Sequence, residues 1–308
     1  MRIILLGPTA SGKTELSLLL AETLNTSIIS ADSRQCYKYM NIGTAKPTPS
    51  ELSRVQHFNI DLLELDQDDS AIEFQNRAAA WEQNILRNNA FVIYAGGSTL
   101  HLQSLIQPFD IVPDSDENNI AAMEEEIKNT GLESLYNRLK LVDPDYISKM
   151  DGMNRQRIIR ALDVYMQTGK PFSSFHSNED ISPDDQTLVY GIQHMREVLY
   201  DRINDRVDHM IENGLVQEVE AILDMGYSPD LQSLNTVGYS EIIKFLQGEW
   251  SLEMASEKIK THTRRYAKRQ ITWFKRWNFI NWLDANGKKS SELQEILLSD
   301  LAAKAKKG

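Results

Sequence analysis

The sequence predicts an α/β protein with a parallel sheet flanked by helices and a mostly helical insertion. Three observations predict this fold class. Short apolar runs alternate with amphipathic segments in the first third of the chain, a glycine-rich loop joins the first run to the first amphipathic segment, and strand patterns stop between about residues 112 and 186 before they resume. Such alternation is typical of βαβ units, in which helices connect parallel strands.

The elements of the first third follow in a regular order. RIILL (2–6) predicts the first strand, KTELSLLLAETL (13–24) the first helix and SIIS (27–30) the second strand. Further along, SAIEFQNRAAAWEQNIL (70–86) predicts a helix and FVIYAGG (91–97) a strand.

A helical insertion then interrupts the sheet. Its amphipathic segments are NIAAMEEEIKN (119–129), LESLYNRLKLV (132–142) and RQRIIRALDVYMQ (155–167). The polar, proline-containing stretch HSNEDISPDDQ (176–186) has the composition of a linker. We therefore predict a P-loop-containing core made of residues 1–112 and 187–308, and an insertion domain made of residues 113–186.

The chain returns to the sheet after the insertion. TLVYGI (187–192) predicts a strand, and REVLYDRINDRVDHMIE (196–212) and VQEVEAILDMG (216–226) predict helices. A long basic helix is expected from about Leu252 to Arg276, followed by the short run FINWLD (279–284). The tail AAKAKKG (302–308) predicts a frayed end.

Composition limits the class of protein. Of the 308 residues, 41% are hydrophobic and 25% charged, which is ordinary for a soluble globular protein, and no apolar run approaches the roughly 20 residues of a membrane helix. The single cysteine, Cys36, cannot form a disulfide within the chain and is expected to serve packing. Because no signal-peptide pattern follows Met1, we expect a cytoplasmic protein without a membrane partner.

Charge is segregated along the chain. The net charge of −11 argues by itself against a nucleic-acid partner, because phosphate backbones repel acidic surfaces. DIVPDSDENNIAAMEEE (110–126) is acidic, however, whereas KIKTHTRRYAKRQITWFKRW (258–277) contains Lys and Arg but no Asp or Glu. A local basic face is therefore compatible with the acidic total.

The loop GPTASGKT carries the strongest chemical signal. Gly7 and Gly12 bracket a tight turn between a strand and a helix, where backbone N–H groups and the helix dipole converge on an anion. Lys13 adds a positive charge, and Thr14 offers a hydroxyl group to Mg²⁺. This motif predicts a P-loop NTPase-like sheet that binds a diphosphate-bearing ligand. The predicted diphosphate-binding residues are Gly7, Pro8, Thr9, Ala10, Ser11, Gly12, Lys13 and Thr14.

The acidic partner of this loop is harder to find. The strand FVIYAGG ends in Gly96 and Gly97, without the carboxylate that P-loop NTPases commonly carry on a second core strand. The nearest carboxylate is Asp32, which follows the strand SIIS and is expected at the carboxyl edge of the sheet. A metal ligand, a general base and the N-cap of a following turn are three roles that its position leaves open.

Seven motifs over nearly the whole chain resemble those of the bacterial tRNA dimethylallyltransferases, also called tRNA isopentenyltransferases. In order they are GPTASGKT, ADS followed by YKYMNIGTAKP, YAGGSTLHLQ, RQRIIRALDVY, REVLYDRINDRV, VGYSE and AKRQITWFKRW. That family transfers the dimethylallyl group from dimethylallyl diphosphate to N6 of the adenosine immediately 3′ of the anticodon, in tRNAs that read codons beginning with U. The resemblance implies a prenyltransferase whose loop holds the donor's diphosphate, without nucleotide hydrolysis.

The resemblance implies three catalytic residues. An exocyclic adenine amine is a poor nucleophile, so a general base helps, and Asp32 is the candidate. The leaving diphosphate needs positive charge, which Lys13, Arg206 and an Mg²⁺ cofactor bound through Thr14 would supply. Arg206 matches the family's diphosphate-binding arginine.

Without the resemblance, the residues around Arg206 favour a structural role for this arginine. A surface ion pair with Asp205 or Glu212 is the ordinary expectation for an arginine in such a helix. Arg202, one turn earlier on the same helix face, is a weaker candidate for the diphosphate.

The target adenosine must leave the stack of the anticodon loop to be reached, and the resemblance implies which residues contact the tRNA. They are Asp32, Ser33, Arg34, Gln35, Thr99, Gln156, Arg157, Ile158, Ile159, Arg160, Gly238 and Tyr239. The basic helix is expected to meet RNA phosphates through Arg264, Arg265, Lys268, Arg269, Lys275 and Arg276. Trp273 and Phe274 on the same helix are expected in the core, and His101 is expected to replace a family tyrosine by packing.

Three alternatives share some of these features. A prenyltransferase acting on AMP, ADP or ATP would use the same loop, but a small nucleotide needs neither the insertion nor the basic helix. A P-loop kinase lacks its second acidic motif here, and a noncatalytic RNA-binding module would leave the phosphate loop unexplained. We therefore expect tRNA, through its anticodon stem-loop, and dimethylallyl diphosphate as partners of a monomer.

Overall fold

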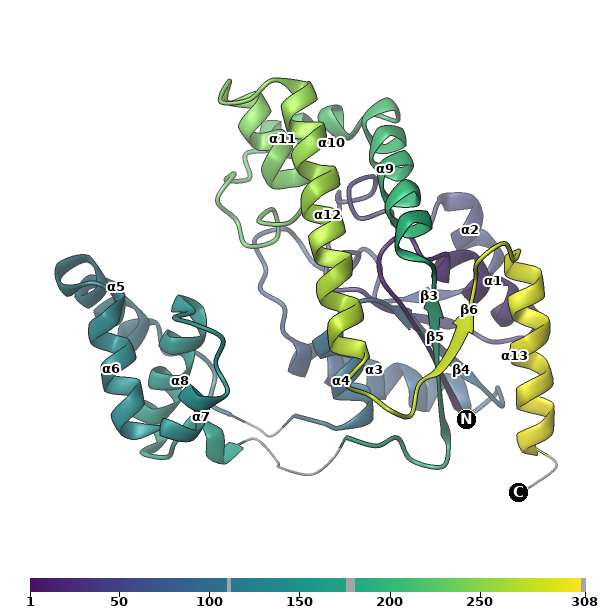
Figure 1. Cartoon of the computed structure of the whole chain (residues 1–308), viewed down its shortest axis with the longest axis horizontal. Coiled ribbons are helices and arrows are strands. Elements are labelled where there is room, and N and C mark those ends of the chain that lie inside the picture. Colours follow the sequence, from purple (N-terminus) through teal and green to yellow (C-terminus); the bar gives the residue numbers. More distant parts are fainter. Residues whose placement is uncertain (110–111, 176–180, 306–308) are drawn as a thin grey trace. The chain divides into compact units, whose positions relative to one another are not determined.

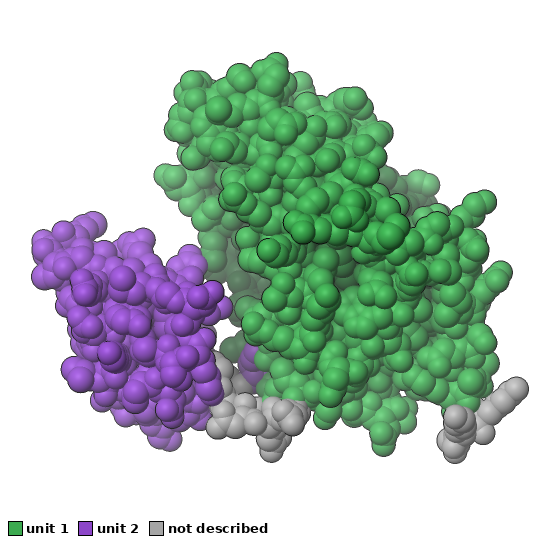
Figure 2. All heavy atoms as spheres, in the orientation of Figure 1, with its two compact units in different colours: residues 1–108, 181–308 green, residues 109–180 purple. Residues whose placement is uncertain are grey.

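The computed structural model describes residues 1–109, 112–175 and 181–305. The chain forms two compact units, one of residues 1–108 and 181–308 and one of residues 109–180 (Figure 2). These boundaries lie a few residues from the predicted ones, because Ile181 packs against the core of the larger unit. Residues 176–180 of the predicted linker lie outside the described residues.

The larger unit is built on a parallel sheet. Among the described residues it has six strands in the order β3-β2-β4-β1-β5-β6. The strands are β1 (Arg2–Leu6), β2 (Ile28–Ala31), β3 (His57–Phe58), β4 (Val92–Gly96), β5 (Thr187–Gln193) and β6 (Asn281–Asp284). Leu6 and Ala31 both pair with Gly96, so β1, β2 and β4 end at the same edge of the sheet.

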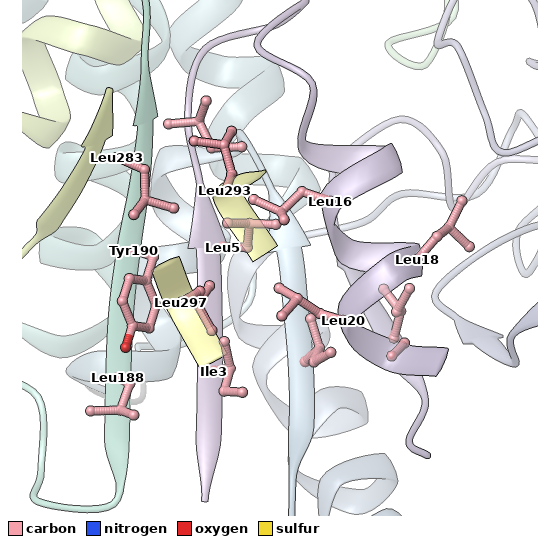
Figure 3. Close-up of a cluster of buried hydrophobic side chains, with 14 of the residues drawn as sticks. Ile3, Leu5, Leu16, Leu18, Leu20, Leu188, Tyr190, Leu283, Leu293 and Leu297 are labelled. Atoms are coloured by element: carbon pink, nitrogen blue, oxygen red, sulfur yellow. The ribbon is translucent and has the colours of Figure 1, made fainter. Parts of the chain in front are cut away.

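Helices cover both faces of this sheet (Figure 1). The helices that the structure describes in the larger unit are α1 (Lys13–Leu24), α2 (Pro49–Arg54), α3 (Ala71–Leu86), α4 (Thr99–Ile106), α9 (Arg196–Glu212), α10 (Leu215–Asp224), α11 (Tyr239–Leu246), α12 (Leu252–Phe274) and α13 (Ser290–Ala305). On one face, Leu16 and Leu20 of α1 and Leu297 of α13 pack against Ile3 and Leu5 of β1 (Figure 3). The free energy gained from each such buried side chain is about 2 kcal/mol.

The opposite face packs against α3, α4 and the end of α12. Phe74, Leu102 and Phe274 are fully buried there against Ile4 and Leu6. Because α12 is held at its carboxyl end by this core, its preceding turns pass the edge at which the strands end. The long helix is thereby placed next to the phosphate loop, which starts from that edge.

Helices α9–α12 form a third core with the segment after β2. Cys36, Tyr37 and Met40 from that segment are buried against Val219 of α10 and Ile259 of α12. The expectation that Cys36 serves packing is confirmed, since its side chain is fully buried.

The smaller unit is helical, as predicted. It contains α5 (Glu117–Thr130), α6 (Leu132–Val142), α7 (Pro144–Ser148), α8 (Arg155–Thr168) and the 3₁₀ helix η1 (Phe172–Phe175). Its own core includes Met123, Leu135, Leu139, Ile158 and Leu162. A unit with a separate core is what the predicted insertion requires.

The C-terminal end differs from the prediction. Residues 302–305 continue α13 instead of fraying, because Leu293, Leu297 and Leu301 of this helix are buried against the sheet. Residues 306–308 lie outside the described residues. In the part of the chain that the structure describes, no helix has the length and apolarity to cross a membrane.

Candidate active site

The loop from Gly7 to Thr14 connects β1 to α1, as the motif predicts. Ala10 and Gly12 adopt positive φ values of 62° and 94°, which turn the backbone tightly before the helix. Within the described residues, the N-terminus of α1 has no side-chain cap. The unpaired N–H groups of its first turn are therefore available to an anion.

Lys13 folds back over this loop. Its Nζ donates hydrogen bonds to the backbone oxygens of Gly7 at 3.0 Å and Pro8 at 2.7 Å. The pKa of Lys13 is lowered to about 7, mainly by burial and also by the positive charge of the nearby Arg206, while the negative charge of Asp32 opposes both effects. Two cations, Lys13 and Arg206, thus face one carboxylate, Asp32, at the loop. This excess of positive charge favours the binding of a polyanion.

Two arginines of α9 face the loop. Arg202 donates from Nε to the backbone oxygen of Ala10 at 2.8 Å, so it braces the loop. Burial is the main cause that lowers the pKa of Arg206, while Asp32 raises it and Arg202 lowers it. Among the described ion pairs, Arg206 joins neither Asp205 nor Glu212. The surface ion pair that the residues alone favoured is therefore wrong.

Asp32 follows β2 directly and lies at the edge where the strands end. Its Oδ1 accepts hydrogen bonds from the backbone N–H groups of Arg34 at 2.8 Å and Gln35 at 3.3 Å, so the capping role is present. Over the described ranges, no hydrogen bond reaches Oδ2. One oxygen therefore orients the carboxylate, and the other can accept a proton.

Two cavities meet at Asp32. The first has a volume of about 100 Å³ and contains Lys13 and Thr14 in its lining, and the second has a volume of about 230 Å³ and is lined in part by Arg34 and Gly238. The residues that line both cavities are Thr9, Asp32, Thr44, Arg206 and Tyr266. A ligand at the loop and a second molecule in the larger cavity would therefore approach each other beside Asp32.

Sequence reasoning missed Thr44, which lines both cavities, and Gln270, which lines the smaller one. Gln270 is 3% exposed, accepts from the N–H of Thr9 at 3.0 Å and donates to the backbone oxygen of Gly97 at 2.7 Å. The sequence did contain an indication of Gln270, because it shares a helix face with the apolar Ala267 and Phe274. A polar side chain on a buried face needs a hydrogen-bond partner. Thr44 lies within the motif YKYMNIGTAKP, but no further feature of the sequence singled it out.

The predicted tRNA-contacting residues of the larger unit differ in which cavity they line. Ser33, Arg34 and Gly238 line the larger cavity. Gln35 lines the smaller one, where its side-chain amide bonds to the Ser30 hydroxyl and to backbone oxygens. Thr99 begins α4 and lines neither of these two cavities.

Three of the predicted tRNA-contacting residues have buried side chains. Tyr239 is fully buried and its hydroxyl donates to Glu218 at 2.5 Å, because α11 turns this residue into the third core. Ile158 and Ile159 are buried in the smaller unit, since they occupy the apolar face of α8. Contact of these three residues with tRNA stays a prediction.

The neighbours of those isoleucines have other surroundings. Gln156 and Arg157 are exposed at the start of α8. Arg160 forms an ion pair with Asp163 at 3.1 Å. Gln156 and Arg157 are thus the accessible part of the predicted stretch, and their contact with tRNA stays a prediction.

The basic helix α12 has one buried and one exposed side. Its exposed cations are Arg265, Lys268 and Arg269, followed by Lys275 and Arg276 just after the helix. Among the described ion pairs, none involves these five residues. Arg264 is half-buried and donates to Asn204 at 2.7 Å.

The expected core residues are confirmed. Phe274 is fully buried, and Trp273 packs against the same core. His101 is buried and stacks on Phe74 with ring centroids 4.2 Å apart. Burial lowers the pKa of His101 to about 4, so it is a neutral packing residue near pH 7.

Comparison with known proteins agrees with this arrangement. A family model described as IPP transferase matches residues 35–277. A tRNA dimethylallyltransferase of a Thermoanaerobacter species is 43% identical over 307 residues, with 98% of each chain covered. The tRNA dimethylallyltransferase 1 of Bacteroides thetaiotaomicron is 42% identical over 96% of this chain and 94% of its own.

Solved structures are similar over the same length. The tRNA delta(2)-isopentenylpyrophosphate transferase of Staphylococcus epidermidis is 36% identical with a TM-score of 0.70, covering 98% of both chains. A eukaryotic dimethylallyltransferase acting on tRNA is 27% identical with a TM-score of 0.79, covering 92% of this chain and 74% of that one. With a family match over most of its length and relatives above 40% identity, the chain belongs to the IPP transferase family.

Proposed function

We propose that this chain transfers a dimethylallyl group from dimethylallyl diphosphate to N6 of the adenosine immediately 3′ of the anticodon, in tRNAs that read codons beginning with U. The products would be N6-isopentenyladenosine and diphosphate. That the chain is a prenyltransferase acting on tRNA follows from its family and the names of its relatives. The observation that supports the finer proposal is the pair of adjoining cavities with Asp32 and Arg206 in their shared wall.

The smaller cavity suits the diphosphate of the donor. The first turn of α1 offers backbone N–H groups, and Lys13 and Arg206 add positive charge at the same place. As the bond between the allylic carbon and oxygen breaks, negative charge grows on the diphosphate. Cations that are already fixed in position stabilise that charge more in the transition state than in the bound donor.

The residues present also fit Mg²⁺. Thr14 brings a hydroxyl oxygen to the lining of the smaller cavity, and hard divalent cations prefer oxygen ligands. Over the described residues, no three His, Cys, Asp or Glu side chains gather as a metal site, so diphosphate oxygens would provide most ligands. When bound, the ion would neutralise charge on the leaving group.

Asp32 would act on the other reactant. The N6 lone pair attacks the allylic carbon, the carbon–oxygen bond breaks, and the N6 proton passes to Oδ2 of Asp32. Oδ1 stays bonded to the N–H groups of Arg34 and Gln35, which keeps the carboxylate oriented during the transfer. A positioned base of this kind accelerates a reaction by about 10² to 10⁴.

The larger cavity would receive the adenosine after it leaves the anticodon stack. Its lining combines polar groups of Ser33 and Arg34 with the apolar side chains of Ile203, Val207 and Ile259. Such a mixture suits a flat base that must be both stacked and oriented. The exposed cations of α12 would meet the RNA phosphates, and a single chain would suffice for activity.

A single assay tests the activity. The purified protein, dimethylallyl diphosphate, Mg²⁺ and an anticodon stem-loop with an adenosine-rich loop are incubated without ATP, and the digested RNA is analysed by mass spectrometry. The expected product is one isopentenylated adenosine next to the anticodon. A strict requirement for ATP, or activity on AMP but not on the stem-loop, would reject the proposal.

The Asp32→Asn variant tests the base. Asparagine keeps a carbonyl oxygen for the N–H groups of Arg34 and Gln35 but cannot accept the proton, so kcat is expected to fall by about 10² or more while stem-loop affinity stays near that of the wild type. Asp68→Asn, at an exposed position, is the matched control and should retain activity. A wild-type kcat for Asp32→Asn would remove Asp32 as the base.

A further inference from the structure

One polar side chain crosses the interface between α12, the phosphate loop and the end of β4. Gln270 lies 261 residues from Thr9 in sequence, yet its Oε1 accepts from the Thr9 N–H at 3.0 Å. Its Nε2 donates to the backbone oxygen of Gly97 at 2.7 Å. The oxygen and the nitrogen of one buried amide therefore both form hydrogen bonds, one to the phosphate loop and one to the turn after β4.

The geometry around Gly97 is fitted to this side chain. A Cβ atom at Gly97 would lie 2.4 Å from Nε2 of Gln270 and 3.2 Å from the backbone oxygen of Gly7. Only a residue without a side chain allows the amide to approach Gly97 O so closely. The glycine at the end of β4 thus makes room for Gln270 where the second acidic motif of P-loop NTPases was missing.

The bond to Thr9 determines which loop groups face the ligand. Thr9 lines both cavities and lies in their shared wall with Asp32 and Arg206. Because the Thr9 N–H is held by Gln270, the anion must be bound by the later N–H groups of the loop. Loss of Gln270 would leave the partly buried N–H of Thr9 and the buried oxygen of Gly97 without these partners, and the loop would shift to find others.

We propose that Gln270 is a positioning residue that sets the phosphate loop and the Gly96-Gly97 turn in the geometry needed for transfer. It acts through Thr9 and Gly97 and takes no proton or charge from the substrates. A displacement of the loop by about 1 Å would misalign the donor carbon and the amine, and such misplacement lowers rates strongly. The inference rests on the proposed function only for its kinetic readout.

The first test is Gln270→Met, which preserves the size of the side chain but removes both hydrogen bonds. The expected result is a fall of about tenfold or more in kcat/KM for dimethylallyl diphosphate, with a change of about twofold or less in KM for the stem-loop. Inorganic diphosphate with Mg²⁺ should also bind more weakly in calorimetry. Thr272→Ala, on the exposed side of the same helix, is the control and should match the wild type.

Gln270→Glu separates positioning from simple destabilisation. A protonated glutamic acid donates to Gly97 O and accepts from Thr9 N–H, as glutamine does, whereas the ionised form repels Gly97 O and the diphosphate. Burial raises the pKa of a carboxyl group, so the protonated form persists above its ordinary range. The activity of Gln270→Glu relative to the wild type should therefore rise as the pH falls.

The results for the Gln270 variants test the positioning role, and the activity of the wild type tests the proposed function. Wild-type kinetics and diphosphate affinity in Gln270→Met, or a pH-independent activity ratio for Gln270→Glu, would overturn the positioning role. Absence of transfer by the wild type would instead reject the proposed function. In that case, unchanged diphosphate affinity in Gln270→Met would still refute the role of Gln270 in the loop.

Discussion

Lys13 shows how a single residue joins the fold to the chemistry. Its Nζ is bonded to two backbone oxygens of the loop, while burial and Arg206 lower its pKa to about 7. Near neutral pH the lysine is therefore close to the point at which it loses its charge. A bound diphosphate would favour the charged form, which couples ligand binding to proton uptake.

The first prediction follows from this shift. At pH 8, above the pKa of about 7, Lys13 is mostly neutral in the free protein and should take up a proton when Mg²⁺ and diphosphate bind. At pH 6 it is already charged, so little uptake is expected. Calorimetry in two buffers of different ionisation enthalpy measures the proton count.

Lys13→Arg is the matched control for this measurement. Arginine stays charged at both pH values, so the uptake at pH 8 should be smaller than in the wild type by up to about one proton. Equal proton counts for the two proteins at pH 8 would show that Lys13 does not titrate on binding.

Site residues could be predicted where they belong to a contiguous sequence motif or directly follow a recognisable strand. The loop residues Gly7–Thr14 and the adjacent strand and helix form one contiguous motif, and Asp32 follows a recognisable strand. Gln270 was missed because its partners, Thr9 and Gly97, are brought to it by the packing of α12 on the sheet. Arg206 required the family resemblance, because its sequence neighbours Asp205 and Glu212 favoured an ion pair that the fold does not form.

At the scale of elements, α12 divides its residues between two tasks. Ile259, Ala267, Gln270 and Phe274 are buried and fix the helix to the rest of the larger unit. Arg265, Lys268 and Arg269 are exposed. A helix that is rigid on one side and cationic on the other is suited to a phosphate backbone.

A salt titration tests this division. In Arg265→Gln/Arg269→Gln, binding of the stem-loop should weaken, and the slope of log K against log salt should become less steep by about 0.7 for each phosphate that the protein no longer neutralises. Lys288→Gln/Lys289→Gln removes the same charge from exposed positions after β6 and serves as the control. Equal slopes for the two double variants would exclude Arg265 and Arg269 from phosphate binding.

Segments with a clear apolar pattern were predicted well, including the five-residue strand β1, whereas the two-residue strand β3 was not predicted. Residues 132–142 and 196–212 form α6 and α9 with the predicted bounds, because their apolar periodicity extends over several turns. β3 is two residues long and exists only because His57 and Phe58 pair with β2. No helix was predicted over α13, because its burial depends on a sheet distant in sequence.

At the scale of the whole molecule, the chain has separate cores in its two units. The larger unit is interrupted in sequence, yet β1 pairs with both β4 and β5, so the segments before and after the insertion share one sheet. The smaller unit buries Met123, Leu135, Leu139 and Leu162 within its own helices. The sequence predicted this organisation because the insertion lacks strand patterns, and the predicted bounds differ from those of the smaller unit by a few residues.

Because each unit has its own core, a core mutation in one unit is expected to destabilise that unit and not the other. Leu162→Ala removes a fully buried side chain from α8 and should destabilise the smaller unit by about 2–5 kcal/mol. Hydrogen exchange measured by mass spectrometry should become faster in α6 and α8 but not in β1 and α1. Diphosphate affinity at the loop should stay unchanged, because none of the described residues of the smaller unit lines the cavity around Lys13.

Leu141→Ala provides the control within the same unit, because Leu141 is 85% exposed on α6 and its removal should leave exchange unchanged. Addition of Mg²⁺ and diphosphate should slow exchange in α1 and β1 of both variants, since a ligand stabilises the unit that binds it. If Leu162→Ala accelerated exchange equally in α8 and α1, the two units would unfold as one cooperative body. The insertion would then have to be treated as part of the fold of the larger unit, despite its separate core.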